Sequence, residues 1–208
     1  MARSSNTGKC ELCGHGAAES PIVRHLAECG SNHDAKGPAG PLVHLRFQSA
    51  EDPRYWIHLE ARANAALRQV DALLRRVWLE CCGHMSAFRL GRAEISMGSR
   101  VGEVFDRKGL KVDYEYDFGT TTALKGQVVG GREGSLGRSA TRLLARNDPI
   151  KWSCTDCTAP ATVVCPYCMD EGDCLFCGTH ASRHPHAKDE VYLPVVNSPR
   201  MGMCGYTG

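Results

Sequence analysis

The chain has 208 residues, of which 42% are hydrophobic and 23% are charged, and its formal net charge at pH 7 is +2. This composition is typical of a globular protein and argues against an intrinsically disordered chain. No stretch is apolar over the length that spans a membrane, and residues 1–6 lack the apolar core of a signal peptide, so we expect a cytoplasmic protein with no membrane partner. In that reducing compartment the 12 cysteines are better explained as metal ligands than as disulfides.

The first motif in chain order has the spacing of a short zinc finger. Its candidate ligands are Cys10, Cys13, His25 and Cys29. Pro21 suits the first turn of a helix on which His25 and Cys29 would lie one turn apart and face the same ion. The motif resembles CCHC-type zinc fingers. Glycines and prolines in residues 30–41 predict a flexible linker, so we assign residues 1–40 to a finger with its linker.

The middle segment, residues 41–147, predicts an antiparallel sheet and one long amphipathic helix. A strand is expected at residues 55–60. A helix is expected from about Ala63 to Cys82, where apolar residues recur on one stripe and Gly83 provides the stop.

Further strands are expected at residues 87–90, 94–97, 111–118 and 123–129. The third of these alternates most sharply, and its polar face carries three carboxylates, from Asp113, Glu115 and Asp117. We interpret this row as the solvent side of an antiparallel strand rather than as a cation site. The glycine-rich residues 130–137 are expected to form a mobile connector.

Two motifs of this segment resemble those of a known family. The sequence WLECCGHMSAF at residues 78–88 ends the expected helix and enters a strand, and YEYDFG at residues 114–119 lies on a later strand. Both are similar to motifs of the plasmid pRiA4b ORF-three-like family, over roughly residues 41–146. The resemblance implies an α+β domain with an antiparallel sheet and a link to mobile elements. It implies little chemistry, because a shared fold does not carry function.

Near the C-terminus, three cysteine pairs and a histidine group lie within 33 residues. The candidate ligands are Cys154, Cys157, Cys165, Cys168, Cys174, Cys177, His180 and His184, with His186 as the alternative to His184. Each pair provides half of a tetrahedral zinc site, so two ions are predicted here and three zinc ions in the whole chain. So short a segment buries too little apolar area to fold alone, and we expect the zinc to be structural.

The order of these pairs resembles cross-braced modules of the MYND type, in which the first and third pairs share one ion and the second and fourth share the other. The resemblance implies one site of Cys154, Cys157, Cys174 and Cys177 and a second site of Cys165, Cys168, His180 and His184. It also implies a module that docks peptide motifs of a partner protein. The spacing leaves open a sequential arrangement, with the first two pairs on one ion. We assign residues 148–208 to this module and a C-terminal tail.

Charge is distributed unevenly along the chain. Residues 41–147 carry 17 basic and 12 acidic side chains, a net charge of +5, whereas residues 148–208 carry four basic and seven acidic side chains, a net charge of −3. Any contact with nucleic acid is therefore expected from the middle segment and not from the tail.

Five cysteines invite other interpretations. Cys165 and Cys168 enclose the Pro-Tyr of a glutaredoxin dithiol motif, but no helix is predicted after it, as that chemistry requires. Cys81 and Cys82 are interpreted as small packing residues at a helix end, and Cys204 is assigned no role.

From these patterns we expect an α+β protein flanked by small zinc-stabilised modules, which acts as a non-enzymatic protein-interaction adaptor or regulator. Two alternatives remain open: nucleic-acid binding through the basic middle segment, and dithiol redox chemistry at Cys165 and Cys168.

Overall fold

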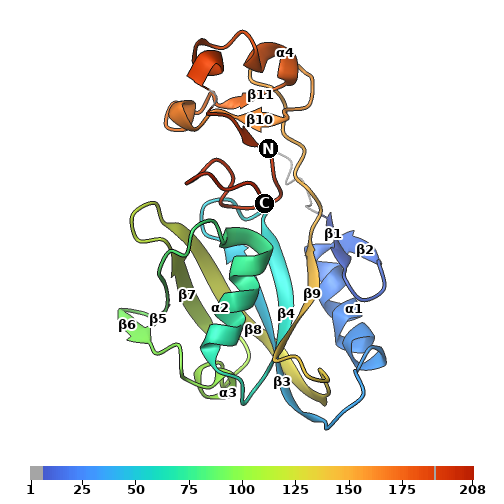
Figure 1. The fold of residues 1–208 in the computed structure, drawn as a ribbon. Coiled ribbons are helices and arrows are strands. Elements are labelled where there is room, and N and C mark those ends of the chain that lie inside the picture. Colours follow the sequence, from blue (N-terminus) through green and yellow to red (C-terminus); the bar gives the residue numbers. More distant parts are fainter. Residues whose placement is uncertain (1–6, 190) are drawn as a thin grey trace. The chain divides into compact units, whose positions relative to one another are not determined.

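A computed structural model describes residues 7–189 and 191–208, which form two compact units (Figure 1). The first unit takes the chain up to Arg76 together with Met85–Asp148, and the second takes Val77–His84 together with Pro149–Gly208. No helix in the described part of the chain combines the length and the apolar character needed to cross a membrane.

The first unit is built on a nine-stranded sheet with the order β2-β1-β9-β4-β3-β8-β7-β5-β6, and every pairing is antiparallel. The strands are β1 (Thr7–Cys10), β2 (Gly16–Ala18), β3 (Gly40–Ser49), β4 (Trp56–Arg62), β5 (Ser86–Leu90), β6 (Ala93–Ile95), β7 (Lys111–Tyr116), β8 (Thr122–Gly134) and β9 (Thr141–Asn147). The expected antiparallel sheet is confirmed. Because β1 pairs with β9, the N-terminal finger belongs to the same sheet as the middle segment.

Few helices accompany this sheet, and the two longest cover its opposite faces. They are α1 (Glu19–Asn32) and α2 (Leu67–Leu74), and a short α3 (Val101–Val104) follows β6. Along β3, Arg46 forms an ion pair with α1, whereas its neighbour Phe47 points to the other face and contacts Phe88. Phe88 in turn packs on Tyr114, whose hydroxyl donates to Asp71 of α2 at 2.7 Å.

The long helix expected over residues 63–82 is not present. After α2 the chain makes only one π-helical turn (Arg75–Leu79). Ala63 cannot join the helix, because its N–H donates to the carbonyl of Pro41 at 2.9 Å and its carbonyl accepts from the N–H of Gly102 at 2.8 Å.

The connector expected at residues 130–137 is instead strand over much of its length, because β8 extends into it and pairs with β3. A Cβ on Gly131 would lie 2.9 Å from the carbonyl oxygen of Leu42, so glycine permits the close approach of these two strands. The flexible linker expected at residues 30–41 is shorter as well, since α1 and β3 leave only residues 33–39 between them.

Each carboxylate of the row on and just after β7 has a partner within the protein. Asp113 pairs with Lys125 at 2.8 Å and Glu115 pairs with Arg89 at 3.1 Å, both at the solvent side of the sheet. Asp117 differs from the expectation, because it is buried, has a φ of +63°, and accepts hydrogen bonds from backbone N–H groups that follow it.

The second unit has little regular structure. Its three short strands, β10 (Val163–Val164), β11 (Leu175–Phe176) and β12 (Leu193–Pro194), have the order β11-β10-β12. Single turns of helix make up η2 (Pro166–Cys168), α4 (Gly178–Ala181) and η3 (Pro185–Asp189). One of its buried clusters consists of three cysteines with Phe176 and Ala181, a composition expected where metal supports a small hydrophobic core.

Candidate metal centres

Four groups of cysteine and histidine side chains come together among the described residues, and any of them could hold a metal ion. Within each group the four potential ligand atoms lie within 4.8 Å of one another. The groups are Cys10, Cys13, His25 and Cys29; Cys154, Cys157, Cys177 and His180; Cys165, Cys168, His184 and His186; and Cys81, Cys82, His84 and Cys204. In a tetrahedral zinc site, Zn–S bonds of about 2.3 Å and Zn–N bonds of about 2.0 Å place two sulfurs about 3.8 Å apart and a sulfur and a nitrogen about 3.5 Å apart.

The N-terminal group is built by β1 and α1. Cys10 ends β1, and a tight turn, closed by the N–H of Gly14 donating to the carbonyl of Cys10 at 2.8 Å, carries the chain past Cys13. His25 and Cys29 lie one turn apart on α1, as the spacing predicts. The Sγ atoms of Cys10 and Cys29 are 3.7 Å apart, and Cys13 Sγ lies 3.2 Å from His25 Nε2. These distances are close to those of a tetrahedral site.

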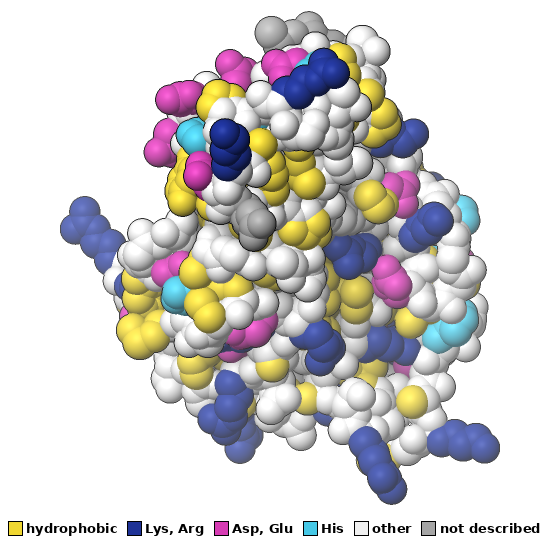
Figure 2. Space-filling view, turned by 45° about the horizontal axis from the view of Figure 1, so that its top comes forward, with side chains coloured by type: hydrophobic (Ala, Val, Ile, Leu, Met, Phe, Trp, Pro, Cys, Tyr) yellow, Lys and Arg dark blue, Asp and Glu magenta, His cyan; other side chains and the backbone are white. Residues whose placement is uncertain are grey.

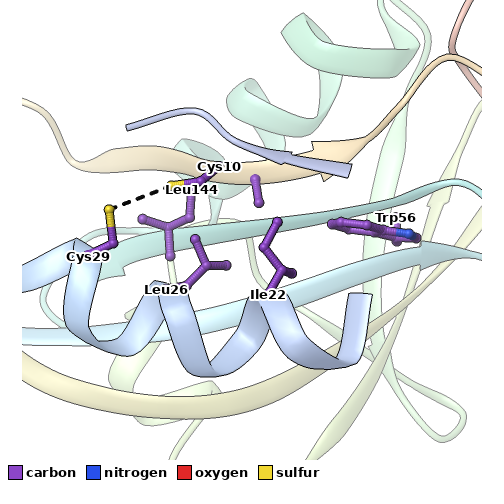
Figure 3. Packing of buried hydrophobic residues seen from close by; sticks show 7 residues of the cluster. Cys10, Ile22, Leu26, Cys29, Trp56 and Leu144 are labelled. Atoms are coloured by element: carbon purple, nitrogen blue, oxygen red, sulfur yellow. Dashed lines mark hydrogen bonds between the residues drawn. The ribbon is translucent and has the colours of Figure 1, made fainter. Parts of the chain in front are cut away.

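Apolar packing holds this group against the sheet (Figure 3). Ile22 and Leu26 extend from the face of α1 that also carries Cys29, and they pack with Trp56 and Leu144 in one buried cluster. This packing fixes the rotation of the helix, so that Cys29 faces Cys10.

Two arginines of the sheet fix the C-terminal end of α1, next to Cys29. Arg132 and Arg142 each donate from Nη2 to the carbonyl of Gly30 at 3.1 Å. The buried carboxylate of Glu60 accepts from both, at 2.7 Å and 2.6 Å. Positive charge at a helix C-terminus is favourable, and α1 has no basic residue in its own last turn.

The second group lies around α4. Cys177 directly precedes this helix and His180 lies within it, so that His180 Nδ1 is 3.3 Å from Cys177 Sγ and 3.5 Å from Cys154 Sγ. Cys157 Sγ is 3.9 Å from Cys177 Sγ.

The third group joins the end of β10 to η3. Cys165 follows β10 and Cys168 ends η2, and both are buried. His184 Nε2 lies 3.3 Å from Cys168 Sγ, while His186 Nδ1 lies 3.4 Å from Cys165 Sγ and 3.5 Å from Cys168 Sγ.

The predicted cross-brace therefore needs two corrections. The pairs interleave as expected, and the sequential arrangement is not found. However, Cys174 belongs to neither group: His180 takes its place beside Cys177, because the first turn of α4 returns the ring to that sulfur. His184 and His186 then both serve the other group, and are not alternatives.

The fourth group contains no residue that the sequence analysis assigned to metal. The interpretation of Cys81 and Cys82 as packing residues is wrong, because Cys81 is only partly buried and Cys82 is exposed. The close spacing of Cys82 and His84 was a usable signal. Its last member, Cys204, lies 120 residues further along the chain than His84 and could not be found from spacing.

The crowding of thiols shifts their pKa values in the metal-free protein. Burial, followed by hydrogen bonds with neighbouring thiols, raises the pKa of Cys29 to about 12, and hydrogen bonds with Cys204 and Cys81 raise that of Cys82 to about 12. In contrast, hydrogen bonds from the backbone and ring of His180 lower the pKa of Cys177 to about 6. A divalent cation would favour the thiolates in every group, so metal binding would release protons and weaken as the pH falls.

Comparisons with known proteins add little. No model of a protein family matches the sequence, and no curated protein matches it. Among solved structures, the chain is similar to the protein of unknown function MM3350 from Methanosarcina mazei Go1, with a TM-score of 0.41 and 14% identity over 59% of this chain and 70% of that one. The resemblances to the pRiA4b ORF-three-like family and to MYND-type modules stay predictions.

Proposed function

We propose that the protein is a zinc-stabilised, non-enzymatic adaptor or regulator that binds a partner protein through its second unit. The observation that carries the proposal is the closed donor set of the N-terminal group and of the two groups around α4 and η3. Each offers four ligand atoms within 4.8 Å of one another, and four such ligands would complete the tetrahedral shell of a structural zinc ion and leave no position for a substrate or a reactive water. Thiolate and imidazole ligands favour zinc over magnesium or calcium, which prefer oxygen.

The exposed surface next to these ligands supports a protein partner. Tyr167, between two ligands of the third group, is 62% exposed, and the acidic side chains that follow it, Asp170, Glu171 and Asp173, are exposed as well. Figure 2 shows acidic and hydrophobic side chains close together over the second unit, in the upper part of the view. An exposed tyrosine followed in the chain by exposed carboxylates suits a partner that offers an apolar pocket and basic side chains, whereas the carboxylates repel phosphates.

Chemical cross-linking in cells, followed by capture of the tagged full chain, tests this proposal. The double variant Tyr167→Ala/Glu171→Lys changes the surface and no ligand, and Glu133→Lys in β8 is the matched control for added positive charge. We expect one partner to be enriched with the wild type and the control and lost with the double variant, at equal zinc content. No enrichment, or equal enrichment with the double variant, would contradict the proposal.

One observation favours nucleic-acid binding as a second candidate. Four arginines, from the end of β4, from α2 with its π-helical turn and from the β8–β9 connection, line a hollow of ≈ 720 Å³ in the first unit: Arg62, Arg68, Arg76 and Arg138. Among the described residues that line it there is no carboxylate. Such a hollow provides the positive charge that phosphate groups require.

Fluorescence anisotropy with labelled duplex DNA and RNA tests this candidate. Arg68→Ala/Arg138→Ala should weaken binding and reduce the slope of log K against log salt by about 2. Arg92→Ala/Arg107→Ala, at exposed arginines outside the hollow, should change neither. Absence of binding at low salt, or binding that salt does not weaken, excludes it.

Dithiol redox chemistry is the third candidate and the weakest. The residues that follow Cys165 form only a single 3-10 turn, Pro166–Cys168. A redox-active dithiol instead needs the N-terminus of a full helix, which lowers the pKa of its first cysteine. Cys165 and Cys168 also lie within one group with His184 and His186, where a bound ion would occupy both thiolates.

A further inference from the structure

Two distant parts of the chain bring the fourth group together, and both belong to the second unit. Cys81, Cys82 and His84 follow the π-helical turn, and Cys204 lies in the C-terminal tail. Cys82 Sγ lies 3.6 Å from the sulfurs of both Cys81 and Cys204. The Nε2 atom of His84 lies 2.9 Å from Cys82 Sγ and 3.1 Å from Cys204 Sγ.

The backbone adopts unusual conformations to achieve this. Gly83 has a φ of +79°, which turns the chain so that Cys82 and His84 face the same point. Cys204 has a φ of +46°, a left-handed conformation that is unfavourable for a residue other than glycine. Such a conformation persists only where the surroundings fix it, and here it directs the sulfur of Cys204 to the other three ligands.

Packing of the tail places Cys204 next to the other three donors. The buried hydroxyl of Ser198 donates to the carbonyl of Trp78 at 2.6 Å, and Tyr206 is buried on the other side of Cys204. Between them, Gly202 approaches Met169 so closely that a Cβ would lie 2.6 Å from its sulfur. The four donors are therefore brought together by the fold, as in a preformed ligand site.

Disulfide chemistry does not explain this geometry. The sulfur–sulfur distances of 3.6 Å exceed the disulfide bond length of about 2.05 Å and match the edge of a tetrahedral zinc site. A histidine nitrogen beside two sulfurs has no part in a disulfide, but it completes a set of three thiolates and one imidazole.

We propose that Cys81, Cys82, His84 and Cys204 bind a fourth zinc ion, which fastens the C-terminal tail to the Val77–His84 segment. This site differs from the other three, because Cys82 and Cys204 are exposed and none of its four ligands is buried. We therefore expect a competing chelator to reach the ion of this site most easily and to remove it before the ions of the other three sites. The proposal does not depend on the adaptor function, since it concerns only ligands that the three expected sites do not use.

Native mass spectrometry of the reduced full chain, loaded with zinc and then desalted, tests this site. We expect four zinc ions in the wild type, three in Cys204→Ser and three in His84→Ala. The matched control Cys174→Ser, which removes a sulfur outside all four groups, should keep four ions. Three ions in the wild type, or four in Cys204→Ser, would overturn the proposal, because the fourth ion would then be absent or bound elsewhere.

Hydrogen exchange during titration with a weak chelator provides a second measurement, which does not need a variant to fold. Loss of the first ion should coincide with loss of protection over residues 198–206, while the other ligand segments keep theirs. Simultaneous loss of protection at all the ligand segments would show that the first ion released does not come from the proposed site.

Discussion

The structure places His180, and not Cys174, in the second metal group. The same substitution, cysteine to serine, made separately at Cys174 and at Cys177 tests this assignment. Cys174→Ser and Cys177→Ser each replace the sulfur of a partly buried cysteine by oxygen, three residues apart. Only Cys177 belongs to a group, with its Sγ 3.9 Å from Cys157 Sγ and 3.3 Å from His180 Nδ1. The pair therefore separates the loss of a ligand from the loss of a thiol.

The expected effects differ by an order of magnitude. A structural zinc ion contributes an apparent 10–16 kcal/mol at pH 7, roughly, and a serine hydroxyl is a poor replacement for a thiolate ligand. Because a whole domain is stable by only about 5–15 kcal/mol, Cys177→Ser should unfold the second unit. At Cys174 the same substitution should cost about 1 kcal/mol, as is usual for a partly buried site without a special role.

Limited proteolysis and zinc content measure the difference. We expect Cys177→Ser to lose one ion or more and to be cleaved within residues 149–208, while Cys174→Ser keeps the zinc content and the cleavage pattern of the wild type. Loss of zinc from Cys174→Ser, or equal resistance of both variants, would refute the assignment made from the structure.

Three other predictions concern charge, pH and metal removal. Glu60→Gln leaves Arg132 and Arg142 without the buried carboxylate they share, and should reduce the free energy of unfolding in urea by about 3 kcal/mol; a loss below about 1 kcal/mol would show that this carboxylate is dispensable. Burial lowers the pKa of His44 to about 4. Between pH 6.5 and pH 4 the unfolded chain therefore binds more protons than the folded protein, and the free energy of unfolding falls as the pH falls, by up to about 1.4 kcal/mol per pH unit. His44→Gln should flatten this dependence, and an unchanged slope would contradict it. Excess EDTA should remove the hydrogen-exchange protection of the second unit and leave that of β3, β4 and β8; protection of the second unit that survives complete zinc removal would contradict a structural role for the metal.

Local spacing predicted most members of the candidate metal groups, because two cysteines separated by two residues come close together in a tight turn, as Cys10 and Cys13 do. It failed where the partner is chosen by tertiary structure. The turn of α4 decides between Cys174 and His180, and the docking of the tail through Ser198 decides that Cys204 meets Cys82. Neither of these two contacts can be predicted from the spacing of the residues in the sequence.

The sheet was predicted only in part. The strands β4 and β7 were expected from the sequence, whereas β3 and β9 were missed, although buried Val43, Leu45 and Phe47 alternate with polar residues along β3. The Gly-rich end of β8 suggested a connector, because glycine signals a turn when seen alone. In the structure it serves the close approach to Leu42 on the neighbouring strand.

The measurement that tests the account most directly is the alkylation of the cysteines, followed residue by residue with mass spectrometry, in the zinc-loaded protein and after chelation. If zinc occupies the groups described above, their thiols are protected until the chelator is added, and Cys165 and Cys168 react only then. Rapid alkylation of Cys165 in the fully loaded protein would contradict a structural role for its thiolate and would favour dithiol redox chemistry instead.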